Sequence, residues 1–488
     1  MSASMAWLDP VSFLILCPLA GALAVSLLPG RNTAVRLLAL FFSGMECLTV
    51  FALWRALPHS GWAFSGTLPW LPSVGASYHV AVDALSLSLI GAAALLTVLV
   101  VLGSWTQVKD RVAGFHAWVL VLMAALAGTF ASRDLLCFYV FWEAVLIPMY
   151  FLIGIHGGPG RLAAATKFVI YTAVGSLLML AAILAAARRG GHWEFSLDVL
   201  QASQPLPGRL EYWAFAAFAL AFAIKVPLFP LHTWLPQAHV EAPTGGSVLL
   251  AGVLLKMGVY GFLRIAFPLF PAAAAAAAPW LGGLAVAGIL YGALMALAQD
   301  DLKKLVAYSS VSHLGYCMLG ICTLRLTGAA GASFLMLSHA VTTGALFFLV
   351  GMLYERSHSR RLGDFSGLAT KAPRFAAALG FIAFASAGVP GLCGFSGELP
   401  VLAAAWKARP LWALGAVLGV VLGAAYLLRA YQRIAFGAVR CPDNNFPDLR
   451  LREILVLAPL LLLAVFLGLA PRFLMAPLEA CLSGGLFQ

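Results

Sequence analysis

Apolar stretches of about 20 residues recur from one end of the 488-residue chain to the other. Folded as an α-helix, a stretch of that length crosses the roughly 30 Å of hydrocarbon in a bilayer. Hydrophobic residues make up 62% of the chain and charged residues only 10%, whereas soluble domains are about half apolar and about a quarter charged. The sequence therefore predicts an all-α polytopic membrane protein and excludes a soluble fold.

The apolar stretches predict about 14 transmembrane helices. Their expected ranges are 11–29, 34–56, 82–103, 113–131, 134–156, 162–187, 212–237, 245–270, 279–299, 301–324, 329–354, 374–404, 410–436 and 453–472. Before the first range the only charged residue is Asp9, and Leu-Pro-Gly-Arg follows it in place of a small-residue cleavage site. We interpret this range as a retained helix and not as a signal peptide.

The basic residues of the loops predict the orientation. An even number of helices places both termini on one side, and the loops of the other side carry the excess of lysine and arginine. These residues are Arg31, Arg36, Lys109, Arg111, Arg161, Lys303, Lys304, Arg356, Arg360, Arg361, Lys371, Arg374, Arg440, Arg450 and Arg452. The positive-inside rule assigns them to the cytoplasm, so both termini are expected on the other side of the membrane. The net charge of +11 then reflects topology, and no nucleic-acid partner is expected.

The chain resembles itself at an offset of about 165 residues. The matches are Asp134-Leu135 with Asp301-Leu302, Ala173-Val174 with Ala340-Val341, AFAIKVP at 221–227 with AFASAGVP at 383–390, and RIAF at 264–267 with RIAF at 433–436. Four matches in one order predict two repeats of five helices. Because five is an odd number, the second repeat must cross the membrane in the opposite orientation, as in the inverted repeats of transporters.

These matches divide the chain into four units. The expected units are 1–112 with three helices, 113–271 with the first five-helix repeat, 279–440 with the second, and 441–488 with the last helix and a tail. In both repeats the fourth helix carries proline after the matched segment, Pro227 and Pro230 in one and Pro390 in the other. Proline removes a backbone donor, so two broken helices are expected, although a kink used only for packing is the alternative.

Four charged residues lie near the middle of apolar spans. They are Glu143, Lys225, Lys256 and Glu398. Such a residue costs about 2.5–3.5 kcal/mol on insertion scales and normally faces a protein interior with a function. Three histidines, His232, His313 and His339, add groups that exchange protons near neutral pH. This pattern predicts a proton channel, with the histidines as relay residues.

A static ion pair between Glu143 and Lys225 is the structural alternative. Lys256 argues against it, because the first repeat then holds two lysines for one carboxylate, and burial disfavours the charged form of a lysine. For each histidine the alternative is a core residue with satisfied hydrogen bonds. Our hypothesis is that Glu143 controls the charge of Lys225, that Lys256 passes the proton on with the histidines, and that Glu398 delivers it to the far side.

The eight cysteines are scattered, mostly inside apolar spans. They form no CxxC pair and no Cys/His spacing typical of a metal site. We therefore predict no metal site, no iron–sulfur cluster and no disulfide framework in this chain.

Three segments resemble a known family. The runs RDLLCFYVFWEAVLIPMYFLIG, AFAIKVPLFPLHTWLPQAHVEAPTGGSVLLAGVLLKMGVYGFLR and AQDDLKKLVAYSSVSHLGY are similar to the antiporter-like subunits of respiratory complex I and of Mrp-type cation/proton antiporters. The resemblance extends over nearly the whole chain. It is strongest to the branch of bacterial subunit M and mitochondrial subunit 4, because Glu398 is acidic and no long lateral helix follows the last predicted span.

The resemblance implies a proton-translocating subunit of an NADH:quinone oxidoreductase. Glu143, Lys225, Lys256 and Glu398 match the family's channel residues, and His232, His313 and His339 also stand at family positions. It further implies that NADH, FMN, iron–sulfur clusters and quinone bind partner subunits, and that neighbouring antiporter-like subunits and the lipid bilayer surround this chain. A Mrp-type Na⁺/H⁺ antiporter subunit, a membrane-bound hydrogenase subunit and a passive membrane scaffold are the alternatives.

Overall fold

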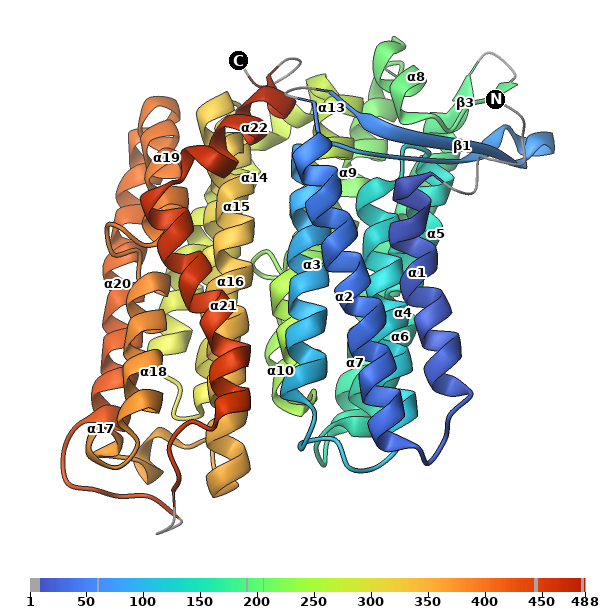
Figure 1. Ribbon diagram of the computed structural model, residues 1–488. Helices are drawn as coiled ribbons and strands as arrows, with labels where there is room; N and C mark the ends of the chain where they lie inside the picture. The colour runs from blue at the N-terminus through green and yellow to red at the C-terminus, as the bar shows by residue number, and fades with distance from the viewer. Residues whose placement is uncertain are drawn as a thin grey trace.

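Long apolar helices stand side by side through most of the chain (Figure 1). The computed structural model describes residues 9–58, 61–189, 192–204, 206–442, 446–483 and 487. The helices that form single long segments are α1 (Pro10–Ser26), α2 (Asn32–Ala56), α3 (Ala84–Gly103), α4 (Val112–Ala131), α7 (Arg161–Ala187), α14 (Pro271–Leu297), α15 (Leu302–Cys322), α16 (Leu326–Ser357), α20 (Pro410–Ala435) and α21 (Leu451–Leu469).

Two further spans are built from shorter consecutive pieces. The first joins α5 (Leu135–Ala144) to α6 (Leu146–His156). The second runs through α11 (Thr244–Leu249), η3 (Leu250–Leu254), α12 (Lys256–Gly261), η4 (Phe262–Ala266) and α13 (Phe267–Leu269). Within the described ranges, 11 helices are long and apolar enough to cross a membrane, and α1 and α18 (Pro373–Ser386) are shorter apolar helices. The predicted helical membrane protein is confirmed.

Two predicted ranges contain a break. The range 212–237 holds α9 (Arg209–Lys225) and α10 (Leu235–Glu241), and the range 374–404 holds α18 (Pro373–Ser386) and α19 (Cys393–Ala408). The intervening residues include the prolines at 227, 230 and 390, so both predicted interruptions are confirmed. At the second break Gly388 has φ +76° and Gly391 has φ +89°, a left-handed backbone that glycine adopts without steric cost.

The two segments matched at 134 and 301 share one local structure. Asp134 caps α5 by accepting from Leu136 N (2.9 Å) and Cys137 N (3.0 Å). Asp301 caps α15 by accepting from Lys303 N (2.8 Å) and Lys304 N (3.0 Å). Each aspartate satisfies two of the donors that a helix start leaves without intrahelical partners.

The two caps lie at opposite ends of the bundle. Asp134 also accepts from Ser77 N (2.9 Å) of the hairpin at the upper end of Figure 1. The backbone of Asp301 instead forms an isolated β-bridge with that of Arg361, close to η5 (Leu362–Asp364) and α17 (Leu368–Lys371) at the lower end.

The sequence analysis did not predict several small elements. An antiparallel hairpin of β1 (Ala63–Leu71) and β2 (Ala76–Val82) lies across one end of the bundle (Figure 1). The helices α8 (Leu197–Ala202) and α22 (Arg472–Leu482), and the short pair β3 (Arg188–Arg189) and β4 (His192–Trp193), lie at the same end.

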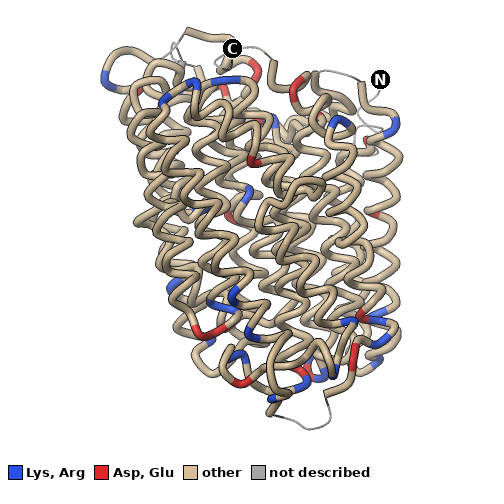
Figure 2. Tube along the Cα trace, turned by 90° about the vertical axis from the view of Figure 1, so that its left-hand side faces the viewer, with Lys and Arg blue, Asp and Glu red and all other residues tan. Residues whose placement is uncertain are grey.

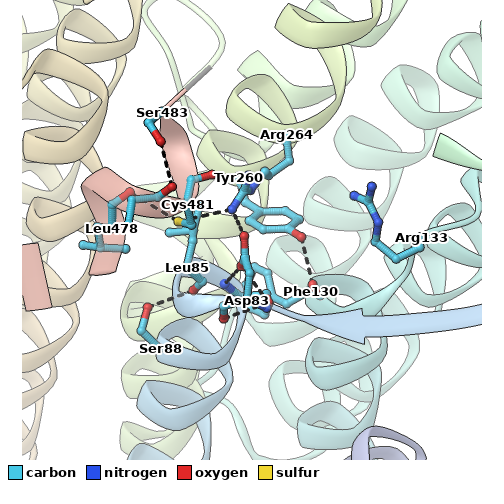
Figure 3. A network of polar contacts seen from close by, with 12 residues as sticks. Asp83, Leu85, Ser88, Phe130, Arg133, Tyr260, Arg264, Leu478, Cys481 and Ser483 are labelled. Carbon is cyan, nitrogen blue, oxygen red and sulfur yellow. Dashed lines mark hydrogen bonds and ion pairs between the residues drawn. The ribbon is translucent and has the colours of Figure 1, made fainter. Parts of the chain in front are cut away.

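A cluster of polar contacts links separate helices at the hairpin end of the bundle (Figure 3). Arg264 of η4 forms an ion pair with Asp83, which caps α3, and it also donates to the carbonyl oxygen of Cys481 in α22 (3.3 Å). Tyr260 donates to the carbonyl oxygen of Phe130 (2.8 Å). Three distant parts of the chain, namely α3, η4 and α22, are thereby fixed to one another.

Burial identifies the central helices. All residues in the most apolar window of α16 are buried, as are 94% of those in α15 and in the span 244–269. In contrast, only about a third are buried in α20 and α21. Most charged residues lie near the two ends of the bundle and few lie between them (Figure 2). These few carry the candidate site.

Candidate functional site

Four of the seven predicted residues form a continuous row inside the bundle. Nζ of Lys256 lies 2.7 Å from Nδ1 of His339. The rings of His339 and His313 have centroids 5.5 Å apart, and Nδ1 of His313 lies 3.6 Å from Oε1 of Glu398. All four side chains are buried. We call this set, Lys256, His339, His313 and Glu398, the central row.

The helix around Lys256 is locally widened. Lys256 begins α12 between the π-helical segments η3 and η4, and its ammonium also donates to the carbonyl oxygen of Ala251. Single π turns inside α-helices are frequent at functional sites, because they displace the helical hydrogen bonds by one residue. Here the displaced carbonyl gives the buried amine a polar partner beside His339.

The central row holds nitrogen atoms suited to relaying a proton. When Lys256 donates to Nδ1 of His339, the neutral imidazole carries its own proton on Nε2. That nitrogen is buried and has no hydrogen-bond partner in the described part of the chain. His313 meets Oγ of Ser386 through Nε2 (3.4 Å) and Glu398 through Nδ1. Each ring therefore offers one nitrogen for accepting a proton and a second for releasing it.

Glu398 ends the central row beside the second helix break. It lies in α19 and is buried against α15 and the residues that separate α18 from α19. Ser386, whose hydroxyl contacts the same histidine, His313, is the last residue of α18. The break therefore brings a helix end and a carboxylate to the same histidine.

Lys225 is fully buried at the first helix break. It is the last residue of α9, where the carbonyl ends of the helix favour a cation, and its Nζ lies 4.8 Å from the ring centroid of Trp142 and 6.0 Å from that of Phe168. Nζ has no hydrogen-bond partner among the described residues. Aromatic faces and a helix end, and not a carboxylate, surround this amine.

Glu143 is less buried than the sequence analysis predicts. The carboxylate is near enough to act on Lys225 through its charge, but no ion pair between the two is found within 4.0 Å in the described ranges. Its side chain is half-buried, and its Oε1 is buried without a hydrogen-bond partner among the described residues. The static Glu143–Lys225 pair considered as an alternative is absent.

His232 stands apart from the central row. It follows the first break and packs among aromatic rings, with centroids 4.9 Å from Tyr291 and 5.8 Å from Phe229. Its Nδ1 is buried and finds no partner in the ranges that the structure covers. The structure therefore brings together four of the predicted residues, places Lys225 and Glu143 near each other, and leaves His232 on its own.

His239 was missed by the sequence analysis. This histidine of α10 is fully buried, and neither ring nitrogen has a partner within the described residues. Its ring stacks on Phe347 of α16 (4.6 Å, 16°), and the charges of Lys256 and Lys303 both act on it. The signal available was a second histidine after the break, in the run HTWLPQAHVEAP that already supplied His232.

Lys303 contacts the chain just after His239. It belongs to the first turn of α15 and donates to the carbonyl oxygens of Ala242 (2.6 Å) and Val240 (3.4 Å), which follow His239 in the chain. Lys303 is thus held against the segment that directly follows His239 at the end of α10. Among the described residues, no group of three or more His, Cys, Asp or Glu side chains is placed to hold a metal ion.

A family model described as NADH:quinone oxidoreductase/Mrp antiporter, TM, matches residues 132–423. The NADH-quinone oxidoreductase subunit M of Rickettsia bellii (strain RML369-C) is 40% identical over 403 residues, which cover 82% of this chain and 81% of that protein. The subunit M of Rhodobacter capsulatus is 41% identical over 422 residues, which cover 84% of this chain and 82% of that protein.

A solved structure agrees with these relatives. Respiratory complex I from Thermus thermophilus with bound NADH contains a chain that matches with a TM-score of 0.86 at 39% identity. The match covers 97% of this chain and 100% of that one. The expected family is therefore confirmed over the central row and both helix breaks. The chain belongs to the NADH:quinone oxidoreductase/Mrp antiporter membrane family.

Proposed function

We propose that this chain is a proton-translocating membrane subunit of an NADH:quinone oxidoreductase, equivalent to subunit M. Relatives of that name match more than four-fifths of its length at about 40% identity, and a chain of a complex I structure shares its fold. In such a complex the subunit is surrounded by other membrane subunits in a bacterial inner membrane. NADH, FMN, iron–sulfur clusters and quinone are then bound by those partners, and this chain contributes the translocase part of the enzyme.

One observation carries this proposal, namely the central row. Its four residues come from four different helices. Nζ of Lys256 lies 2.7 Å from Nδ1 of His339, the rings of His339 and His313 are 5.5 Å apart between centroids, and Nδ1 of His313 lies 3.6 Å from Oε1 of Glu398. A passive scaffold has no use for four costly buried groups in contact. Protons suit these groups better than sodium, since a sodium site prefers clustered carboxylates and carbonyl oxygens.

The proton moves along the central row in steps. Lys256 in its charged form donates to Nδ1 of His339, and His339 releases the proton from Nε2 toward His313. His313 passes it to Glu398 across 3.6 Å, and Glu398 delivers it to the far side through the polar backbone of the second break. Lys303 and His239 supply Lys256 from the loop end of α15.

Glu143 and Lys225 control this transfer electrostatically. Two unit charges 4 Å apart attract by about 4 kcal/mol at an effective dielectric of 20, and moving one charge across 100 mV requires about 2.3 kcal/mol. Closing the gap between Glu143 and Lys225 therefore involves enough energy to change the charge state of Lys225 and, through it, that of Lys256. His232 provides a separate exchange point beside the first break.

Two inverted repeats account for the two broken helices. We assign 113–271 and 279–440 to these repeats, after the three helices of 1–112 and before the tail of 441–488. The equal caps made by Asp134 and Asp301 at opposite ends of the bundle support this assignment. Each repeat then supplies one half-channel, and the loops rich in lysine and arginine face the cytoplasm with both termini in the periplasm.

The test replaces Lys256 by methionine in the whole complex. Membrane vesicles are assayed for NADH-driven proton uptake, for NADH:quinone electron transfer and for the amount of assembled complex. We expect normal assembly with loss of proton uptake and a parallel fall in electron transfer, because the two are coupled. Lys304→Met is the matched control, since Lys304 is an exposed lysine at the start of α15. Unchanged proton uptake in the Lys256 variant would refute the proposed route.

A further inference from the structure

The hydroxyl group of Tyr426 takes no part in the route described for the proton. This tyrosine lies in α20, an outer helix of which only about a third is buried, yet the residue is 1% exposed. The phenol oxygen is buried and has no hydrogen-bond partner among the described residues. A buried tyrosine normally finds a partner for this group. The neighbours of Tyr426 therefore decide what its hydroxyl can bind.

Two contacts between α20 and α15 fix the position of Tyr426. Tyr316 of α15 donates to the carbonyl oxygen of Ala416 in α20 (2.6 Å). Farther toward the start of α15, Val306 lines one small apolar gap together with Leu427 of α20. Since the residue numbers fall along α15 while they rise along α20, the two helices are antiparallel. Tyr426 directly precedes Leu427 and therefore lies between the two contacts, close to the second.

Ser309 and His313 of α15 lie in the same interval. They are four residues apart and hence one above the other on one face of the helix. Ser309 is close to the hydroxyl of Tyr426, but no hydrogen bond joins the two, and the serine donates its own proton to the carbonyl oxygen of Val306 (2.8 Å). Tyr426 thus has a proton available for donation about one helical turn along α15 from His313, a member of the central row.

Glu398 is the carboxylate whose charge acts on Tyr426, and it acts on Tyr316 as well. Tyr316 already donates its proton to α20, whereas Tyr426 still has a proton to offer. At 3.6 Å, the contact of Glu398 with His313 is longer than an ordinary hydrogen bond. The carboxylate is therefore attracted by the ring without being fixed to it, and rotation of the glutamate side chain can exchange the ring for another donor.

We propose that Tyr426 is a positioning residue for Glu398 and that its hydroxyl donates to the carboxylate when the carboxylate has turned away from His313. The inference rests on the proposed function and adds a second position of Glu398 to the last step of the route. In the first position the carboxylate faces His313 and receives a proton. The second position follows release of that proton to the far side, and in it the charged carboxylate is held by Tyr426, which keeps its own proton throughout.

The charge of His313 selects between the two positions. A protonated His313 attracts the carboxylate as a full positive charge, whereas a neutral imidazole does not, and the phenol is then the competing donor. Glu398 therefore stays at Tyr426 until His313 carries the next proton. The turn of the side chain is coupled to the second helix break, because Oε2 of Glu398 lies against Gly388.

The test is an infrared measurement on the purified complex, which needs no proton transport. Difference spectra between acidic and alkaline pH contain a carboxylate band of Glu398, identified as the band that Glu398→Gln removes. We expect this band to shift in Tyr426→Phe, because phenylalanine keeps the ring and its packing but donates no hydrogen bond. Tyr431→Phe is the matched control, since Tyr431 is a half-buried tyrosine of the same helix, and it should leave the band unchanged. A band that is the same in both variants would overturn the proposal.

Replacement of Tyr426 by 3-fluorotyrosine provides a second variant that keeps the hydroxyl group. The fluorinated phenol is a stronger donor, so the Glu398 band should shift in the direction opposite to that in Tyr426→Phe. A shift in the same direction in both variants would contradict a hydrogen bond from residue 426 to the carboxylate.

Proton uptake in vesicles measures the consequence for transport. Tyr426→Phe should assemble normally and lower NADH-driven uptake about threefold to tenfold, which is the factor that one ordinary hydrogen bond contributes. The double variant Tyr426→Phe/Glu398→Gln should be no worse than Glu398→Gln alone, because Tyr426 acts only through Glu398. Unchanged uptake despite a shifted band would overturn the positioning role. The proposed function fails on a different result, namely unchanged uptake in Lys256→Met, which leaves the infrared comparison intact.

Discussion

Glu398 lies directly against Gly388, so that Oε2 of the carboxylate occupies the space that a Cβ atom on this glycine would need. Gly388 begins the glycine-containing turns between α18 and α19 with φ +76°. The last member of the central row is therefore held by the helix break itself. The position of the carboxylate and the conformation of the break cannot change independently.

Gly388→Ala should impair proton transfer without removing any titratable group. The added methyl group meets Oε2 of Glu398, so the carboxylate is displaced from His313. The alanine must also keep the left-handed backbone of residue 388, which costs about 1–2 kcal/mol. We expect proton uptake to fall at least tenfold in assembled complex, as measured in vesicles. Gly423→Ala in α20, where an added Cβ meets open space, is the control and should leave uptake unchanged.

Glu398→Gln should block the exit of the proton. Glutamine keeps the size of the side chain but accepts no proton from His313, and a positioned acid or base contributes about 10²–10⁴-fold to transfer. Proton uptake is expected to fall by about a hundredfold, while Glu398→Asp retains part of it. Glu46→Gln is the matched control, because Glu46 is a fully buried carboxyl group of α2 outside the central row. Equal loss in both variants would contradict a specific role of Glu398.

Glu143→Ala should reduce both proton uptake and electron transfer, because Lys225 then loses the carboxylate that acts on its charge. Lys225→Met is expected to give the same loss. Since both residues belong to one step, the double variant should be no worse than either single one. Additive losses, measured in the same vesicles, would show that the two residues act separately.

Asp83→Asn should destabilise the hairpin end of the bundle. The side chain of Asp83 is 2% exposed, and removing one partner of a buried ion pair costs about 3–5 kcal/mol. Asp198→Asn provides the comparison, since Asp198 is 52% exposed in its pair with Arg133 and an exposed pair contributes about 0–1 kcal/mol. Thermal denaturation of the purified complex should show a clear loss of stability only for Asp83→Asn.

Much of the helical arrangement could be predicted from the sequence. Apolar length specified the spans, and proline at 227 and 390 specified the breaks, because both signals are local. The hairpin Ala63–Val82 was missed since it lies between spans, where apolar length gives no signal. The cue available in the sequence was Gly75, a glycine at the turn of the hairpin, where the structure has φ +69°.

The candidate site could be predicted as a set of residues but not as a geometry. Lys256 and His339 are 83 residues apart in sequence, and their contact depends on how η3 packs against α16. His239 was overlooked because a histidine inside an apolar helix usually indicates only packing. The half-burial of Glu143 depends on how α5 packs in the bundle, and no local pattern in the sequence encodes this.

The bond from Arg264 to Cys481 spans 217 residues, and this separation has a consequence for synthesis in the cell. When η4 and α3 have entered the membrane, Asp83 and Arg264 can already pair, but the carbonyl oxygen that completes the polar cluster is synthesised only after α14 to α21. Docking of α22 therefore closes the hairpin end only after these later helices have been made.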